Sequence, residues 1–195
     1  GDGVKKVLGL EYAQFAKLDV DFRYRYRIDR EQALVARLFG GIGYAYGNST
    51  TMPYSKQYYA GGPFSVRAFR IRSLGPGTYR LSDDENSSYL DQTGDIRLEA
   101  NLEYRFPIVS FLKGALFADA GNVWLLKDNP AIEGDEISSG FMKELGVGVG
   151  AGVRIDIQSF VIRFDLAAPI HKPYEKRYNF DLKEPILNFA FGYPF

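Results

Sequence analysis

The chain has no cysteine among its 195 residues, and histidine occurs once, as His171. Without cysteine there is no disulfide, no thiol nucleophile and no cysteine-ligated zinc site, and one histidine cannot build a multi-histidine metal site. His171 lies near Pro169 and Pro173, so we expect a solvated loop residue there. From these residue types we assign no metal site, no cofactor and no catalytic residue.

Two further features are missing. No run of about 18 apolar residues occurs, so the sequence predicts no transmembrane helix. The 24 Lys and Arg residues balance the 24 Asp and Glu residues, so no overall field attracts nucleic acid. No signal peptide is visible at Gly1-Asp2-Gly3, which indicates a fragment of a larger protein.

Aromatic residues and glycine are abundant instead, with 15 Phe, 14 Tyr and 21 Gly, and this composition favours an all-β architecture. Apolar and charged residues alternate strictly from Leu18 to Ile28, as in a strand. Before Leu18 the pattern leaves open one continuous long strand or a separate short one. Further alternating segments begin at Leu34, Ile96, Leu112, Leu145, Phe160 and Leu187.

These strands are long. In a soluble sandwich, strands average five to six residues and their apolar faces cover a second sheet, whereas residues 96–106 alternate over about twice that length, until Pro107 is predicted to end the strand. An apolar face opposite a face of Arg, Asp, Glu and Gly predicts an outer-membrane β-barrel with a polar lumen. Short connections at residues 29–32 and 107–111, with long loops at the other end, agree with this prediction.

The barrel prediction places an apolar belt on the outside. The belt residues are Leu18, Val20, Phe22, Leu98, Leu102, Val147, Val149, Phe164 and Phe189, with Tyr24, Tyr26, Tyr104 and Trp124 towards the rims. The rim positions follow from the preference of Tyr and Trp for membrane interfaces.

Residues 58–77 fit neither a strand nor a helix. Glycines and prolines punctuate both ends, which predicts a long structured loop, and such loops are usually functional. At its centre, Val66-Arg67-Ala68-Phe69 places one cation between apolar residues. This pattern favours a loop tip that enters a cavity where Arg67 meets a carboxylate. A surface loop with solvated arginines is the alternative.

Three motifs resemble the C-terminal barrel half of the BamA/TamA superfamily, the bacterial surface antigen family. They are residues 61–69 (GGPFSVRAF), 102–107 (LEYRFP) and 117–124 (FADAGNVW), in the family's order. The resemblance runs from about Leu18 to Phe195. It implies an antiparallel transmembrane β-barrel with a long lumenal loop, to which this chain contributes about seven or eight strands, the C-terminal part of a barrel of about 16.

The same resemblance implies roles for particular residues. In the family, the arginine of a Val-Arg-Gly-Phe/Tyr loop folds into the lumen and pairs with acidic residues on the next two strands. Carried over, these residues are Arg67, Glu103 and Asp119, and strand parity independently places both carboxylates on the lumenal side. The loop motif itself comprises Val66, Arg67, Ala68 and Phe69. Ala68 replaces the family's glycine, which argues against a tight positive-φ turn there.

Two other patterns belong to the barrel prediction. The inward glycines at alternate positions from Gly146 to Gly152 leave room for a loop to pack against the wall, or they relieve sheet curvature. The last segment resembles the terminal β-signal of outer-membrane proteins. Its alternating residues are Leu187, Phe189, Phe191, Tyr193 and Phe195.

The resemblance implies a non-enzymatic component that inserts or translocates proteins in the outer membrane of a Gram-negative bacterium. Residues 1–195 are then one C-terminal barrel fragment without POTRA domains. Its expected partners are outer-membrane lipid, nascent outer-membrane protein strands, accessory assembly proteins that bind missing upstream domains, and a second copy of this fragment. A small passive porin or adhesin and a two-partner secretion pore are the alternatives.

Overall fold

The computed structural model describes residues 6–7, 10–79, 92–127, 134–157, 160–175 and 185–195. The strands are β1 (Lys6–Val7), β2 (Leu10–Glu11), β3 (Gln14–Arg27), β4 (Ala33–Tyr46), β5 (Ile96–Val109), β6 (Leu112–Trp124), β7 (Gly146–Ile157), β8 (Phe160–His171) and β9 (Ile186–Phe191). Two short 3-10 helices are η1 (Tyr54–Lys56) and η2 (Phe141–Glu144). β1 and β2 form their own small sheet, so a separate hairpin precedes the long strand β3.

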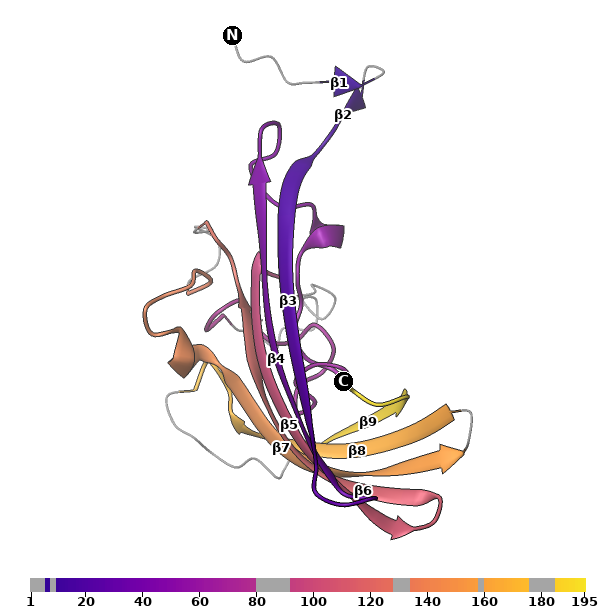
Figure 1. Ribbon diagram of the computed structural model, residues 1–195. Helices are drawn as coiled ribbons and strands as arrows, with labels where there is room; N and C mark the ends of the chain where they lie inside the picture. Colours follow the sequence, from indigo (N-terminus) through magenta and orange to yellow (C-terminus); the bar gives the residue numbers. More distant parts are fainter. Residues whose placement is uncertain (1–5, 8–9, 80–91, 128–133, 158–159, 176–184) are drawn as a thin grey trace.

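The seven long strands form one antiparallel sheet in sequence order, from β3 to β9. This confirms the all-β, barrel-type prediction with seven strands. Figure 1 shows that the sheet is strongly curved, with residues 54–79 of the connection between β4 and β5 and the C-terminus on its concave side. The sheet is not closed, because in the described part of the chain β3 pairs only with β4 and β9 only with β8.

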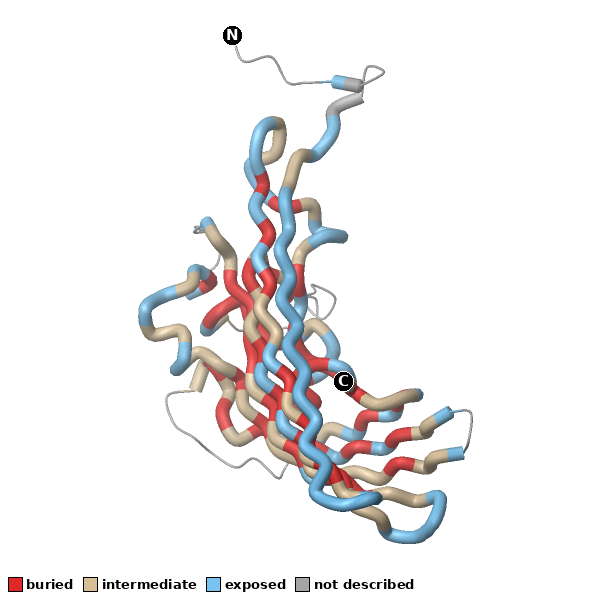
Figure 2. The backbone as a smooth tube through the Cα atoms, viewed as in Figure 1, coloured by how far each residue is buried: buried red, intermediate tan, exposed pale blue. Residues whose placement is uncertain are grey.

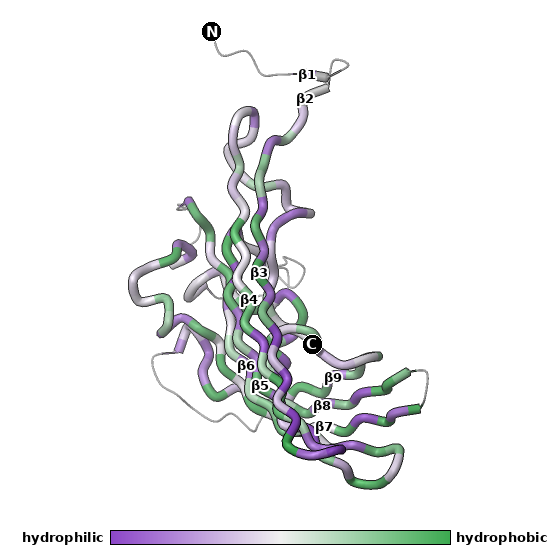
Figure 3. Tube along the Cα trace, in the orientation of Figure 1, coloured by the Kyte–Doolittle hydropathy of each residue, from purple (hydrophilic) through white to green (hydrophobic). Residues whose placement is uncertain are grey.

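The outer face of the sheet is apolar from edge to edge. Outward residues stand opposite one another in register, for example Leu18 with Ile42 and Leu166 with Leu187. Leu18 is 65% exposed and Leu187 is 68% exposed. Figure 3 shows hydrophobic and hydrophilic residues alternating along these strands. Such a face requires an apolar surrounding, as the predicted outer belt does.

The inner face carries the charged and small residues. Cross-strand pairs on this face include Asn101 with Asp119, Asp119 with Gly148, and Asp165 with Asn188. All four of these polar side chains are buried. In Figure 2 the edge strand β3 is exposed along almost its whole length, whereas buried residues concentrate on the other strands and on the loop between β4 and β5.

The two ends of the sheet differ as the sequence predicts. The β3–β4 connection is short, and the carboxylate of Asp29 accepts hydrogen bonds from the backbone N–H groups of Glu31 and Gln32 at 2.8 and 2.6 Å. The connections at the other end are long and include η1 and η2. β5 does not end at Pro107. It continues to Val109 past a register shift, and an irregularity of this kind accommodates a proline that cannot donate to the ladder.

Two single-residue predictions are wrong. Trp124 does not lie at an exposed rim. It is 0% exposed, its Nε1 donates to Glu144 at 2.6 Å, and the Phe141 ring meets it edge-on at 6.2 Å. The residues of η2 therefore cover Trp124. His171 is not a solvated loop residue either, because it ends β8, is buried, and has its Nδ1 2.7 Å from the Leu145 carbonyl oxygen.

Candidate functional site

Residues 58–77 of the loop between β4 and β5 have a fixed path along the inside of the sheet. Backbone bridges join Tyr58 to Gly94 and Ala60 to Leu74, and the N–H of Gly62 donates to the Phe69 carbonyl at 2.8 Å, which closes the tip. Gly62 has φ +97, a conformation open to glycine at no steric cost. The tip, residues 61–70, is therefore a compact and internally bonded unit.

At the base of the loop, Tyr58 lies against β3 and β4. Its hydroxyl donates to the Asp19 carboxylate, and its ring meets Phe39 edge-on at 6.4 Å. Burial and the bond to Asp19 raise the pKa of Tyr58 above its ordinary range. Tyr58 therefore stays protonated and remains a hydrogen-bond donor that anchors the loop to the sheet.

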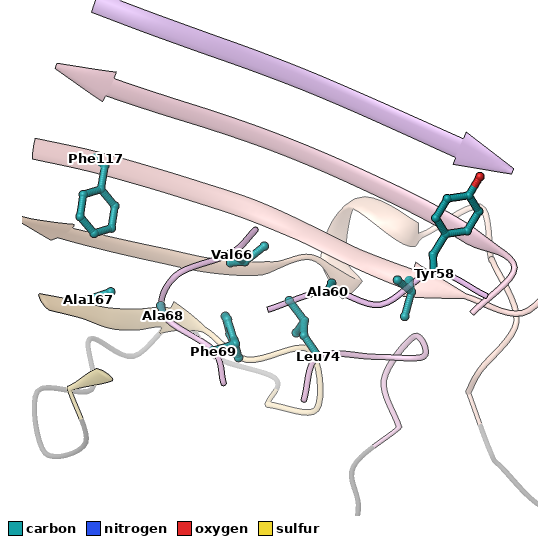
Figure 4. Close-up of a cluster of buried hydrophobic side chains, with 9 residues drawn as sticks. Tyr58, Ala60, Val66, Ala68, Phe69, Leu74, Phe117 and Ala167 are labelled. Atoms are coloured by element: carbon teal, nitrogen blue, oxygen red, sulfur yellow. The ribbon is translucent and has the colours of Figure 1, made fainter. Parts of the chain in front are cut away.

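Apolar side chains fix the loop against the wall. Val66, Ala68 and Phe69 of the predicted motif are all buried, and they form one cluster with residues of the sheet. Figure 4 shows loop and strand side chains converging on this cluster. Its members are Tyr58, Ala60, Val66, Ala68, Phe69, Leu74, Phe117, Val123 and Ala167.

Arg67 lies at the centre of the site and is 0% exposed. Its Nε and Nη2 donate to the two carboxylate oxygens of Asp119 at 2.8 and 3.0 Å, and its Nη1 donates to Glu103 Oε2 at 2.5 Å. The guanidinium also lies 3.5 Å from the centre of the Phe117 ring. The structure thus brings together Arg67, Glu103 and Asp119 in a forked geometry that lysine cannot reproduce.

The ion-pair cluster extends further than the sequence analysis foresaw. Asp165 of β8 lies 3.4 Å from Arg67 Nη1 and accepts hydrogen bonds from Arg154 and Arg163. Arg154 and Arg163 are cross-strand partners, and like charges in such positions repel each other. The shared Asp165 carboxylate compensates that repulsion. Arg154 also donates to Glu103 at 3.0 Å.

Arg163 joins this cluster directly to the loop. Its Nη2 donates to the Pro63 carbonyl at 2.7 Å, and its guanidinium lies 5.0 Å from the Phe64 ring centre. The parity of β7 and β8 reveals inward charges at Arg154, Arg163 and Asp165. It does not reveal that they reach the loop, because strand parity gives the face of a residue and not its height along the barrel.

The glycine wall, which is the row of inward glycines on β7 from Gly146 to Gly152, contacts the loop. One of the two interpretations of these glycines predicts this contact. A Cβ added at Gly148 would collide with the Ala68 side chain, and one added at Gly146 would lie 2.6 Å from Leu74 Cδ1. Ala68 therefore fits against β7 because its own side chain is a single methyl group and the facing residues have no side chain. Further along β7, the same kind of added atom at Gly150 would collide with Phe117.

The terminal pattern holds only in part. Leu187, Phe189 and Phe191 alternate on the exposed outer face of β9. Tyr193 and Phe195 do not continue that face, which corrects the predicted five-residue alternation. Gly192 has φ +82, which ends the extended strand geometry, and Arg105 then contacts the Phe195 carbonyl and the Tyr193 ring.

The site contains no obvious metal position. Among the residues that the structure describes, no group of three His, Cys, Asp or Glu side chains could hold a metal ion. Within those same ranges, no helix is long and apolar enough to cross a membrane.

A curved antiparallel sheet with an apolar outer face, a charged inner face and a buried arginine loop defines a protein of the outer-membrane β-barrel class. The match to a family model is equally clear. The chain belongs to the Omp85 superfamily, whose domain model matches residues 4–195. The family resemblance drawn from the three sequence motifs is confirmed.

Similarity to individual proteins agrees with this assignment. The chain is 29% identical over 164 residues to the outer membrane protein assembly factor BamA of Neisseria meningitidis serogroup B, covering 73% of this chain and 20% of BamA. Its fold resembles that of BamA from Haemophilus ducreyi lacking POTRA domains 1-3, with TM-score 0.66 and 18% identity over 92% of this chain and 35% of that one. CdiB from Acinetobacter baumannii matches with TM-score 0.52 and 16% identity over 92% and 27% of the two chains. The chain thus spans a minor part of each relative.

Proposed function

We propose that residues 1–195 form a C-terminal barrel fragment of a non-enzymatic component that assembles or translocates proteins in the outer membrane of a Gram-negative bacterium. The observation that carries this proposal is the loop tip. Arg67, without solvent exposure, is bound by Glu103 and Asp119 on the inner side of a sheet whose outer side is apolar.

The energetics of the loop contacts support a role beyond stability. A buried ion pair is often no more stabilising than apolar residues of similar volume, because desolvation offsets the attraction. It does fix geometry, since a stranded partner would be costly. The cluster therefore positions residues 61–70 inside the barrel, and a passive porin needs no such internal element.

The open edges indicate how partners bind. Across the residue ranges that the structure describes, β9 and β3 each pair on one side only, and the backbone N–H and C=O groups of the other side can template the addition of another strand. We assign nascent outer-membrane protein strands as the clients at these edges and outer-membrane lipid as the surrounding of the apolar face. Accessory assembly proteins bind through upstream domains, and a second copy of the chain pairs along the same edges when no other strand covers them.

The test is a folding assay. The chain is reconstituted into phosphatidylethanolamine and phosphatidylglycerol vesicles, and the folding of a urea-unfolded outer-membrane barrel protein is followed by its heat-modifiable gel mobility. We expect faster folding than in empty vesicles, reduced to the empty-vesicle rate by Arg67→Ala. Arg70→Ala is the matched control, because Arg70 is exposed in the same loop.

The alternatives give different results in the same vesicles. A passive porin admits small solutes, seen as vesicle swelling, without accelerating the folding of any client. A two-partner secretion pore passes its own exported client into the vesicles and leaves barrel folding unchanged. Equal client folding with and without the chain would refute the assembly role.

A further inference from the structure

The edge strand β9 contacts the loop tip directly. Asn188 lies on the inner face of β9, is 7% exposed, and its Nδ2 donates to the backbone carbonyl of Arg67 at 2.8 Å. The side chain of Arg67 binds β5 and β6, whereas its carbonyl is held from β9. One residue at the tip is thereby tied both to the middle of the sheet and to its free edge.

Residues 192–195 add a second connection between the edge and the same cluster. At Gly192 an added Cβ would meet nothing within 4 Å, so the glycine serves the positive φ and not a close contact. After this turn, Arg105 Nη2 donates to the Phe195 carbonyl at 3.2 Å, and the Phe195 ring centre lies 5.8 Å from the Arg67 guanidinium. Arg105 is also bound to Glu103 at 2.7 Å, which itself binds Arg67.

The edge strand β9 is shorter than the strand beside it and has fewer neighbouring strands. β9 has six residues, and within the described ranges its ladder bonds run only to β8. Segments with few neighbours open at the lowest free-energy cost. The Asn188 hydrogen bond to the loop tip therefore adds a connection that the ladder to β8 does not provide.

We infer that Asn188 and the segment 192–195 are positioning elements for the loop tip, so that the order of residues 61–70 and the docking of β9 are coupled. Displacement of β9 from β8 withdraws the donor from the Arg67 carbonyl and loosens the tip. The coupling is reciprocal. It does not depend on which clients the barrel serves.

Hydrogen exchange on the full chain in lipid nanodiscs tests the inference. The reporters are the hydrogen-bonded amides of the tip, Gly62, Ser65, Arg67 and Phe69. Asn188→Ala and the near-isosteric Asn188→Asp, which removes the donor, should each raise exchange at these amides about tenfold or more. Phe195→Ala, which removes the ring near Arg67, should act in the same direction.

The control and the reciprocal measurement separate coupling from general loosening. Phe189 neighbours Asn188 on the same strand but lies on the outer face, so Phe189→Ala should leave the tip amides at the wild-type rate. Arg67→Ala should raise exchange in residues 186–191 by a comparable factor. Unchanged tip exchange in both Asn188 variants, or an equal effect from Phe189→Ala, would overturn the inference.

Discussion

Arg67 shows how a single residue organises this site. Its guanidinium forms ion pairs with carboxylates of β5, β6 and β8, and the Phe117 ring covers it. The neighbouring arginines share Glu103 and Asp165 with it, whereas Asp119 has Arg67 as its cation and Asn101 as a neutral donor. Loss of Arg67 therefore leaves Asp119 without its cation, whereas Glu103 and Asp165 keep the neighbouring arginines.

Replacing Arg67 by Ala should destabilise the fold by about 3–5 kcal/mol, because it strands a buried carboxylate. Equilibrium unfolding in urea, followed by tryptophan fluorescence in vesicles, measures this change. Arg67→Lys should recover only part of the loss, since an ammonium cannot make the forked pair. A stability within about 0.5 kcal/mol of wild type for Arg67→Ala would contradict the buried role.

A second prediction concerns Gly148. A side chain at this position collides with Ala68, so Gly148→Val should push the loop tip off the wall and raise its susceptibility to protease. Ala151→Val adds the same kind of bulk to β7 on the exposed outer face and should leave the protease pattern unchanged. The same cleavage pattern in both variants would speak against loop packing on the glycine wall.

The elements follow largely from the sequence. Strict alternation predicts the long strands and both faces, because a two-residue period is a local property of extended chain. Alternation does not predict the turn at Gly192, where a positive φ ends the extended geometry. It also does not predict the burial of Trp124, because the covering residues of η2 lie elsewhere in the sequence. Alternation places Arg154, Arg163 and Asp165 on the inner face, but it does not predict that they converge on the loop, because convergence depends on register and curvature across several strands.

The outer face of the strands predicts how charge is tolerated. Leu166 lies on the outer face of β8, opposite Leu187 and Ala151, so Leu166→Lys should cost about 2–4 kcal/mol in a bilayer. Phe111 lies in the β5–β6 turn and is also exposed. Phe111→Lys should cost at most about 1 kcal/mol, as expected near an interface. Equal costs in vesicle unfolding experiments would contradict this placement of the membrane.

At the scale of the whole molecule, the open sheet poses a problem of closure. Unpaired strand edges are costly in hydrocarbon, and in the part of the chain that the structure describes β3 and β9 are the two edges of the sheet. We predict that this chain alone in detergent has the protein mass of a dimer, in which β3 of one copy meets β9 of the other. A monomer whose β9 pairs with its own β3 would overturn the dimer and retain the barrel.

One cross-link tests most directly whether the loop lies inside the sheet. A Cβ added at Gly121 lies 3.0 Å from Val66 Cγ2, 2.8 Å from Glu99 Cγ and 2.9 Å from the Leu98 carbonyl oxygen. A small local shift therefore admits a cysteine there within reach of a disulfide to residue 66, and the chain has no cysteine to interfere. In membranes, Val66→Cys with Gly121→Cys should form an intramolecular disulfide on oxidation, visible as a mobility shift. Val66→Cys with Ala120→Cys, whose second thiol faces outward, should not. No shift in the first pair, or an equal shift in both, would contradict a loop held inside the sheet.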